Sequence, residues 1–334
     1  INAAANITED GILSTGITAN SLSLTAGGFI TADTTASSLT ASTSAVGDID
    51  IDQTGALTLA SVTTHNGSIT VDSVGQLTAT SVSTANTDND INDIVLTTSA
   101  DGIQLGSLDA GATGDIQLTS AVSISNDGNA TTVVNAESLQ VTAKGAVAME
   151  TVVDTVVITT SLAGDISITE ADAIILTSID AYDGSIVVDA GGSISVIDLD
   201  TSNTDDDSND ITLAANNGGM TITTIDAGSA NDVTLTATGS ITAEADTSSL
   251  VSADLLTVSA GNAIDLSTQV AAAILSTSGA GDIALDEVDS ITLTNVMAHD
   301  GSIVVSADGQ ISAITVETDN TDNGSNHITL YASA

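Results

Sequence analysis

Several residue types are missing or scarce in this 334-residue chain, and each shortage excludes a class of protein. The chain has no cysteine and no proline, and lysine and arginine together occur once. Without cysteine there is no disulfide framework and no thiolate metal site. Because phosphate binding needs basic patches, the lack of lysine and arginine excludes nucleic acid as a partner. No apolar run approaches the roughly 18 residues that a membrane-spanning helix requires.

Aromatic residues make up 1% of the chain, yet 42% of its residues are hydrophobic. A core must therefore be built from aliphatic side chains, and the β-branched ones among them favour strands. The chain also carries 44 acidic residues and a formal charge of -43. Disordered acidic chains lack the apolar residues that are abundant here. Carboxylates and apolar side chains must therefore alternate at short range, and the charge makes divalent cations plausible partners.

Internal repetition is the strongest pattern in the sequence. The tripeptide Gly47-Asp48-Ile49 recurs at 164–166 and at 281–283, a spacing of 117 residues (164 − 47 and 281 − 164). We expect residues 1–334 to form one continuous segment of a longer repetitive protein. Its repeat copies are 1–46 (partial), 47–163, 164–280 and 281–334 (partial).

Each 117-residue copy divides into five modules of about 20–27 residues that share an apolar template. In the first module the template residues are Ile49, Ile51, Leu57, Leu59 and Val62. Pairs two residues apart are typical of strands with one buried face, and turn-forming residues separate the pairs. One module cannot bury its apolar face alone, but stacked modules can.

The sequence therefore predicts an all-β, right-handed parallel β-helix (a β-solenoid) with one coil per module and five coils per copy. A string of β-sandwich domains is the alternative, because such domains are close to 117 residues long. The likeness of modules within one copy, and the lack of tryptophan and proline, favour the solenoid.

The longest loop of each copy is rich in oxygen-bearing side chains at alternate positions. Calcium prefers six to eight oxygen ligands, so this spacing predicts a calcium site at one corner of each copy. The expected ligands are Asn86, Asp88, Asp90, Asn92, Asn203, Asp205, Asp207, Asn209, Asn320 and Asp322. The alternative is a solvated loop whose side chains cap turns. No glutamate closes the loop, and Gly324 replaces a carboxylate in the third copy, which favours that alternative.

Nothing in the sequence predicts catalysis. Enzymes that cleave acidic polysaccharides need basic residues to neutralise carboxylates, and Lys144 is the only lysine or arginine. We therefore expect a protein that is not an enzyme and has no cofactor apart from calcium.

Short stretches such as Gly-Ser-Ile-Thr-Val (67–71), Gly-Gln-Leu-Thr-Ala (75–79) and Gly-Gln-Ile-Ser-Ala (309–313) resemble the filamentous haemagglutinin-like adhesins, large bacterial exoproteins of two-partner secretion. The resemblance implies a right-handed β-helix, an extracellular or cell-surface location in a bacterium, and an adhesive or fibre-forming role. We expect a structural segment of a surface fibre or stalk that self-associates or contacts cell-surface or matrix partners. The alternative is an adhesin rod whose binding tip lies elsewhere in the full-length chain.

Overall fold

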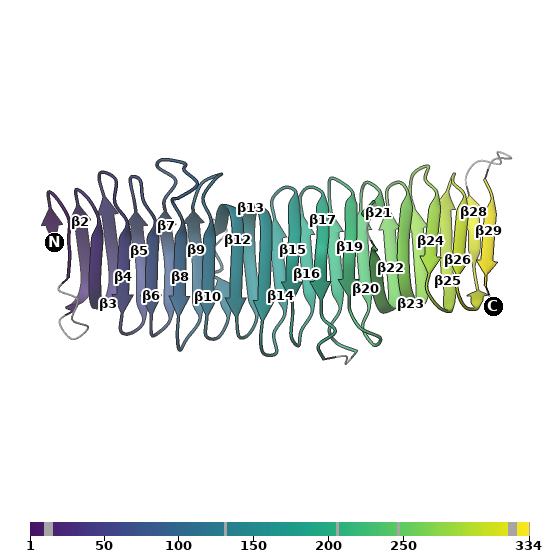
Figure 1. Cartoon of the computed structure of the whole chain (residues 1–334), viewed down its shortest axis with the longest axis horizontal. Coiled ribbons are helices and arrows are strands. Elements are labelled where there is room, and N and C mark those ends of the chain that lie inside the picture. Colours follow the sequence, from purple (N-terminus) through teal and green to yellow (C-terminus); the bar gives the residue numbers. More distant parts are fainter. Residues whose placement is uncertain (10–15, 130–131, 205–206, 246–247, 320–325, 334) are drawn as a thin grey trace. The chain divides into compact units, whose positions relative to one another are not determined.

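The computed structural model describes residues 1–9, 16–129, 132–204, 207–245, 248–319 and 326–333. The chain divides into two compact units, unit 1 (Ile1–Ala163) and unit 2 (Gly164–Ala334), which are described separately. The boundary between them coincides with the start of the repeat copy 164–280. Throughout the described ranges the regular elements are β-strands (Figure 1). A search of the same ranges finds no helix long and apolar enough to span a membrane.

Unit 1 contains thirteen strands that pair in parallel. They are β1 (Asn2–Ala3), β2 (Ile17–Ala26), β3 (Ile30–Thr43), β4 (Ile49–Gln53), β5 (Leu57–Thr63), β6 (Ile69–Ser73), β7 (Leu77–Ser83), β8 (Ile94–Thr98), β9 (Ile103–Asp109), β10 (Ile116–Ser120), β11 (Ile124–Asn126), β12 (Val133–Ala143) and β13 (Val147–Thr160).

Unit 2 repeats this arrangement. Its strands are β14 (Ile166–Glu170), β15 (Ile174–Asp180), β16 (Ile186–Ala190), β17 (Ile194–Asp200), β18 (Ile211–Ala215), β19 (Met220–Asp226), β20 (Val233–Ala237), β21 (Ile241–Ala243), β22 (Leu250–Ala260), β23 (Ile264–Thr277), β24 (Ile283–Glu287), β25 (Ile291–His299), β26 (Ile303–Ala307), β27 (Ile311–Ala313), β28 (Val316–Asp319) and β29 (Ile328–Ala332).

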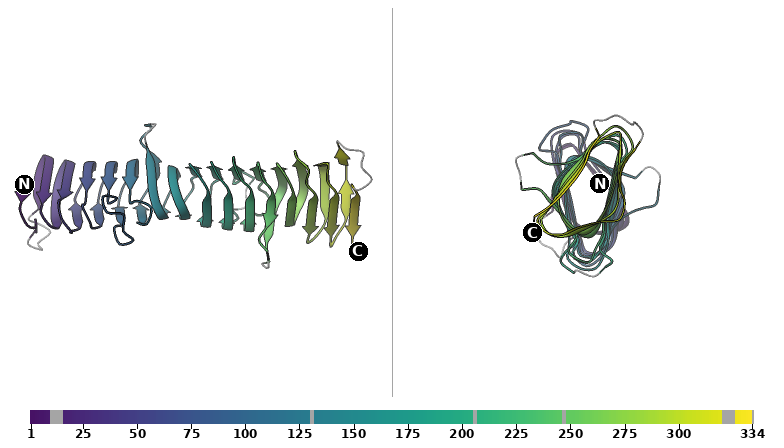
Figure 2. Two further views of the ribbon diagram at one scale, coloured as in Figure 1. Left: turned by 90° about the horizontal axis from the view of Figure 1, so that it is seen from above. Right: turned by 90° about the vertical axis from the view of Figure 1, so that its right-hand side faces the viewer.

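Equivalent residues of successive coils stack directly on one another, which confirms the predicted parallel β-solenoid. Three columns of buried side chains run through unit 1, one for each strand segment of a coil. The first column begins Ile49–Ile69–Ile94–Ile116–Leu139, the second Leu57–Leu77–Ile103–Ile124–Val147, and the third Val62–Val82–Leu108–Val134. Figure 2 shows the strands of neighbouring coils side by side within each unit.

The apolar template predicted from the sequence forms the core. Each of its five residues in the first module, Ile49 to Val62, is at most 2% exposed. The residues between them alternate outward, as in β4, where Ile49, Ile51 and Gln53 are buried while Asp50 and Asp52 face solvent. This two-residue alternation lets an acidic chain keep a dry aliphatic interior.

The register shows a feature that the sequence analysis missed, namely that the fifth coil of each copy is short. In unit 1 Leu139 pairs with Val156, a step of 17 residues (156 − 139), whereas the preceding steps are 20 to 25 residues. No loop interrupts β13, which supplies all three segments of this coil as one 14-residue strand. The first four coils of each copy have the predicted lengths, whereas the predicted 27-residue fifth module (166 − 139) covers the short coil and one further face.

Because of the short coil, the first strand of each new copy stacks in the column next to the one that held the first strand of the preceding copy. We call this shift the one-face advance. In unit 2 β14 lies in the column Ile166–Ile186–Ile211–Val233–Leu256. Its equivalent 117 residues later, β24, stacks instead on the column Ile174–Ile194–Met220–Ile241–Ile264, where Ile264 pairs with Ile283. One copy therefore makes five turns plus one of three faces, about five and one-third turns.

Candidate functional site

The predicted calcium loop of unit 1 joins β7 to β8 and is held by a buried amide. Asn92 is 0% exposed, and its Nδ2 donates hydrogen bonds to the Thr87 carbonyl oxygen at 2.7 Å and to Thr87 Oγ1 at 3.1 Å. Thr84, also buried, donates from Oγ1 to the Asn92 carbonyl oxygen at 2.6 Å. Asn92 thus closes the loop on itself by bonding the backbone of a residue five positions earlier.

Two further predicted ligands tie the loop to neighbouring coils. Asn86 Nδ2 donates to the Thr64 carbonyl oxygen of the preceding coil at 2.7 Å. Asp88 Oδ1 accepts hydrogen bonds from the backbone N–H (3.1 Å) and hydroxyl (3.0 Å) of Thr113 in the following coil. The loop is therefore clamped from both sides along the stack.

The equivalent loop of unit 2 is closed by the same asparagine contacts. Asn209 Nδ2 donates to the Thr204 carbonyl oxygen and hydroxyl, each at 2.8 Å, and Thr201 Oγ1 donates to the Asn209 carbonyl oxygen at 2.7 Å. Asn203 Nδ2 donates to Asp180 Oδ1 at 2.9 Å, and Asp207 has a left-handed backbone with φ of 22°. Both loops are therefore closed by the same asparagine and threonine contacts, which we call the latch, and the latch is part of the repeat.

These contacts bear on the calcium prediction without deciding it. Four of the expected ligands, Asn86, Asn92, Asn203 and Asn209, present amide nitrogens to oxygen acceptors. Asp88, Asp90 and Asp207 lie in the described parts of the loops, and no group of three or more His, Cys, Asp or Glu suited to a metal ion is found in the described ranges. Asp205, Asn320 and Asp322 lie outside the described residues. Calcium binding remains a prediction.

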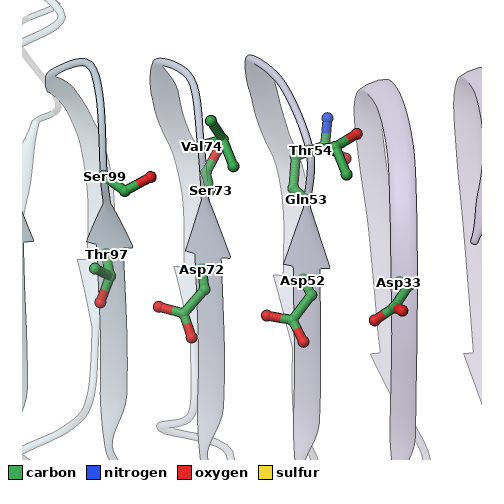
Figure 3. Close-up of a pocket in the computed structure, with 9 residues that line it drawn as sticks. All are labelled: Asp33, Asp52, Gln53, Thr54, Asp72, Ser73, Val74, Thr97 and Ser99. Atoms are coloured by element: carbon green, nitrogen blue, oxygen red, sulfur yellow. The ribbon is translucent and has the colours of Figure 1, made fainter. Parts of the chain in front are cut away.

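A second acidic feature lies on the outer face of unit 1, where three carboxylates form a column. Asp33 pairs in register with Asp52, and Asp52 with Asp72, so the three stand on neighbouring strands β3, β4 and β6. Figure 3 shows them side by side along a shallow groove that Thr97 and Ser99 extend. Neighbouring strands lie about 4.8 Å apart, so these charges repel one another.

The column raises the pKa of its central member. Burial raises the pKa of Asp52, and the carboxylates of Asp72 and Asp33 raise it further. Burial also raises the pKa of Asp50, with Asp52 and Asp72 adding to the effect. A column of neighbouring carboxylates attracts cations.

Buried polar residues at one interior corner were not anticipated from the sequence. Gln53 and Glu287 occupy the same repeat position and are 3% and 2% exposed. The sequence does carry a signal for them. Gln53 lies two residues after Ile51 and four after Ile49, so the strand alternation places it on the same inward face. A polar residue on the inward face of a strand must find hydrogen-bond partners there.

Comparison with known proteins supplies no family for this chain. It matches no protein-family model, no curated protein and no solved structure. A solenoid fold does not by itself indicate a specific function, so function has to be argued from the features above.

Proposed function

We propose that the chain is a non-catalytic structural segment of an extracellular bacterial surface fibre or stalk. Its task is to set length and spacing, and its partners are other copies or matrix and surface molecules. The observation that carries this proposal is the one-face advance. Equivalent strands β14 and β24 lie on different faces of unit 2, so the repeat does not extend one outward surface along the stack.

A repetitive binding surface would require the opposite arrangement. A protein that docks a periodic ligand needs identical side chains at regular spacing along one face. The advance breaks that alignment after every copy while leaving the interior columns continuous within each unit. What the 117-residue period preserves is therefore the core, the strand register and the latch at Asn92 and Asn209.

The chemistry of the surface supports the same role. An oxyanion or acidic substrate would meet carboxylates, and Lys144 is the only lysine or arginine available to offset them. The groove beside Asp33, Asp52 and Asp72 is open and shallow. It lacks the enclosure that small-molecule sites usually have.

Electron microscopy of the native full-length protein tests the proposal. A fibre component should form continuous filaments, and the strand spacing of about 4.8 Å predicts an axial rise of roughly 26 Å per copy. The same face should recur after three copies, at roughly 77 Å, because three advances complete one rotation. Separate rods, each with one distinct end, would instead support the adhesin alternative and direct the search for binding to that end.

The calcium prediction is tested on the same specimens. Filaments are imaged in calcium, after chelation, and after chelation with magnesium restored. If the loops bind calcium, chelation should disorder the filaments and calcium alone should restore them. Asp88→Asn and Asp207→Asn should weaken that response, whereas Asp189→Asn, outside the loops, serves as control. Filaments unaffected by chelation would remove calcium from the account and leave the structural role intact.

A further inference from the structure

Gln53 shows what the corner after the first strand of a copy requires. Its Oε1 accepts hydrogen bonds from Ala36 N–H at 3.1 Å and from Thr34 Oγ1 at 2.7 Å. Its Nε2 donates to the carbonyl oxygens of Ala36 at 2.8 Å and Ala56 at 3.3 Å. The Gln53 amide therefore forms hydrogen bonds with both the N–H and the carbonyl oxygen of Ala36.

The need arises from a mismatch between two stacked coils. β3 runs without interruption past this corner, while the next coil turns there between β4 and β5. Thr34 pairs with Gln53 and Ser38 pairs with Thr58. Between these two pairs the chain advances four residues in β3 but five residues in the next coil. The backbone of Ala36, in the middle of this mismatch, pairs with Ala19 of β2 but has no strand partner in the coil of β4 and β5. A buried backbone group left unpaired is costly.

Glu287 occupies the same position two repeats later (287 − 53 = 234) and meets the same mismatch. Thr268 pairs with Glu287, whereas Ala272 pairs with Thr292. Thr268 Oγ1 donates to Glu287 Oε2 at 2.8 Å, and Val270 N–H donates to the same oxygen at 3.2 Å. Asp289 N–H donates to Oε1 at 3.2 Å. Thr268 and Val270 thus stand where Thr34 and Ala36 stand in unit 1.

The Glu287 carboxyl can take the place of the Gln53 amide only when it carries a proton. In an extended strand the N–H and C=O of one residue point to the same side, so the Val270 carbonyl faces Glu287 as the Ala36 carbonyl faces Gln53. An ionised carboxylate only accepts hydrogen bonds, whereas a protonated carboxyl also donates one. Only the neutral acid can reproduce both functions of the Gln53 amide.

The surroundings of Glu287 favour the neutral form. Burial raises its pKa to about 7, the Asp289 carboxylate adds to the rise, and the hydrogen bonds from Thr268, Val270 and Asp289 N–H limit it. β23 faces Glu287 with Thr268 and Val270, and β26 faces it with Ala307. The ionisable side chains nearby in sequence are Asp265 and Asp286, which point outward, and Asp308, which follows β26; all are acidic.

We propose that Glu287 is a proton-operated lock in unit 2: the neutral acid closes the corner between β23 and β24, and its ionisation loosens β23–β26 at neutral to alkaline pH. The middle copy carries Glu170 at the same position, and Asp172 N–H donates to its Oε1 at 3.2 Å, as Asp289 N–H does to Glu287. Unit 1 carries Gln53 and has a permanent form of the lock. The lock does not depend on a role in fibres.

Hydrogen–deuterium exchange of the full chain, read peptide by peptide between pH 5.5 and 8, tests the lock. Protection factors are corrected for the chemical exchange rate at each pH. Because opening releases the carboxyl to solvent, protection of β23–β26 should fall about thirtyfold across this range and then level off. Protection of the Gln53 corner, β3–β6, should change far less.

Reciprocal substitutions separate the lock from general charge repulsion. In Glu287→Gln the protection of β23–β26 should stay high at every pH. In Gln53→Glu the protection of β3–β6 should become pH-dependent, as that of β23–β26 is in wild type. Unchanged pH dependence in Glu287→Gln, or none gained in Gln53→Glu, would overturn the proposal. If either variant fails to fold, 13C NMR of the seven glutamate carboxyls in the unmodified chain decides. A buried carboxyl titrating near neutrality supports the lock, and ordinary acidic midpoints for all seven refute it.

Discussion

The corner that follows the first strand of each coil is lined differently in the two units. In unit 1 it holds Ser73, Thr98 and Ser120, each at most 4% exposed. Their hydroxyls donate to the carbonyl oxygens of Gly55 at 2.8 Å, Asp101 at 2.6 Å and Ser123 at 3.1 Å. The residues 117 positions later are all alanine, namely Ala190, Ala215 and Ala237.

This difference shows which property of the corner the fold requires. Both linings are small, and both stack in register from coil to coil, as Ser73 does on Thr98 and Ala190 on Ala215. A satisfied buried hydroxyl contributes little net stability, so the two linings are close to equivalent. Gln53 and Glu287 stand apart, because there the side chain replaces backbone partners and its charge state matters.

The largest expected effect comes from the core columns, where the two units should respond alike. Leu96 and its equivalent Leu213 are both 0% exposed. Truncation of either to alanine should cost about 2–5 kcal/mol, through lost burial and an unfilled cavity. Local hydrogen exchange in the affected unit measures each cost. A cost confined to one unit would show that the columns are not packed equivalently.

The next effect distinguishes the units by pH. The pKa of Glu287 rises from 4.5 in the unfolded chain to about 7, so the folded chain binds this proton more tightly. Its stabilising contribution is complete below about pH 4.5 and is lost as pH rises through 7, a change of about 3 kcal/mol. The urea dependence of exchange in unit 2, followed against pH in wild type and Glu287→Gln, gives the difference. Parallel profiles would contradict the assignment to Glu287.

Exchanging the small corner residues should have a smaller effect. Ser73→Ala makes unit 1 resemble unit 2 and should cost under about 1 kcal/mol, since one neutral hydrogen bond is lost. The converse change, Ala190→Ser, should be tolerated as well. Urea denaturation compares both variants with wild type. A loss of several kcal/mol from Ser73→Ala would mean that the hydroxyl ladder itself holds unit 1 together.

The smallest effect concerns the outer acidic column. Asp52→Asn removes the central charge between Asp33 and Asp72 and should stabilise unit 1 by under about 0.5 kcal/mol at pH 7 and low salt. Added salt should reduce that gain, because it already screens the repulsion. Asp154→Asn, outside the column, is the control. A stabilisation that persists in high salt would point to a cause other than repulsion.

Most of the fold could be predicted because the apolar template and turn residues recur at fixed spacing. The alternation at Ile49, Ile51, Leu57 and Leu59 specifies which face is buried, and Gly and Asp mark the corners. The short fifth coil was missed because β13 contains no glycine where the chain bends, and only Asp154 and Thr155 separate the inward Val153 from the inward Val156. Apolar residues flank these two on both sides, so the sequence alone suggests a single straight strand.

The candidate site was harder to predict, because one side-chain type can serve opposite purposes. Asn92 offers an oxygen to a metal and a nitrogen to a carbonyl, and spacing alone does not distinguish the two. In the structure its nitrogen closes the loop onto Thr87. Gln53 was passed over because the template counted apolar residues, although its inward parity placed it in the core.

The one-face advance is the central structural claim, and engineered cysteine pairs test it directly. The native chain has no cysteine, so spin labels can be attached at chosen outward positions only. In the structure Ala284 pairs with Asp265, whereas Thr257 belongs to another column, where it pairs with Thr234 and Ile274. Labels at 265 and 284 should therefore show strong dipolar broadening in the electron paramagnetic resonance spectrum, and labels at 257 and 284 much weaker broadening. The reverse result would mean that each copy stacks without rotation, and it would contradict the account.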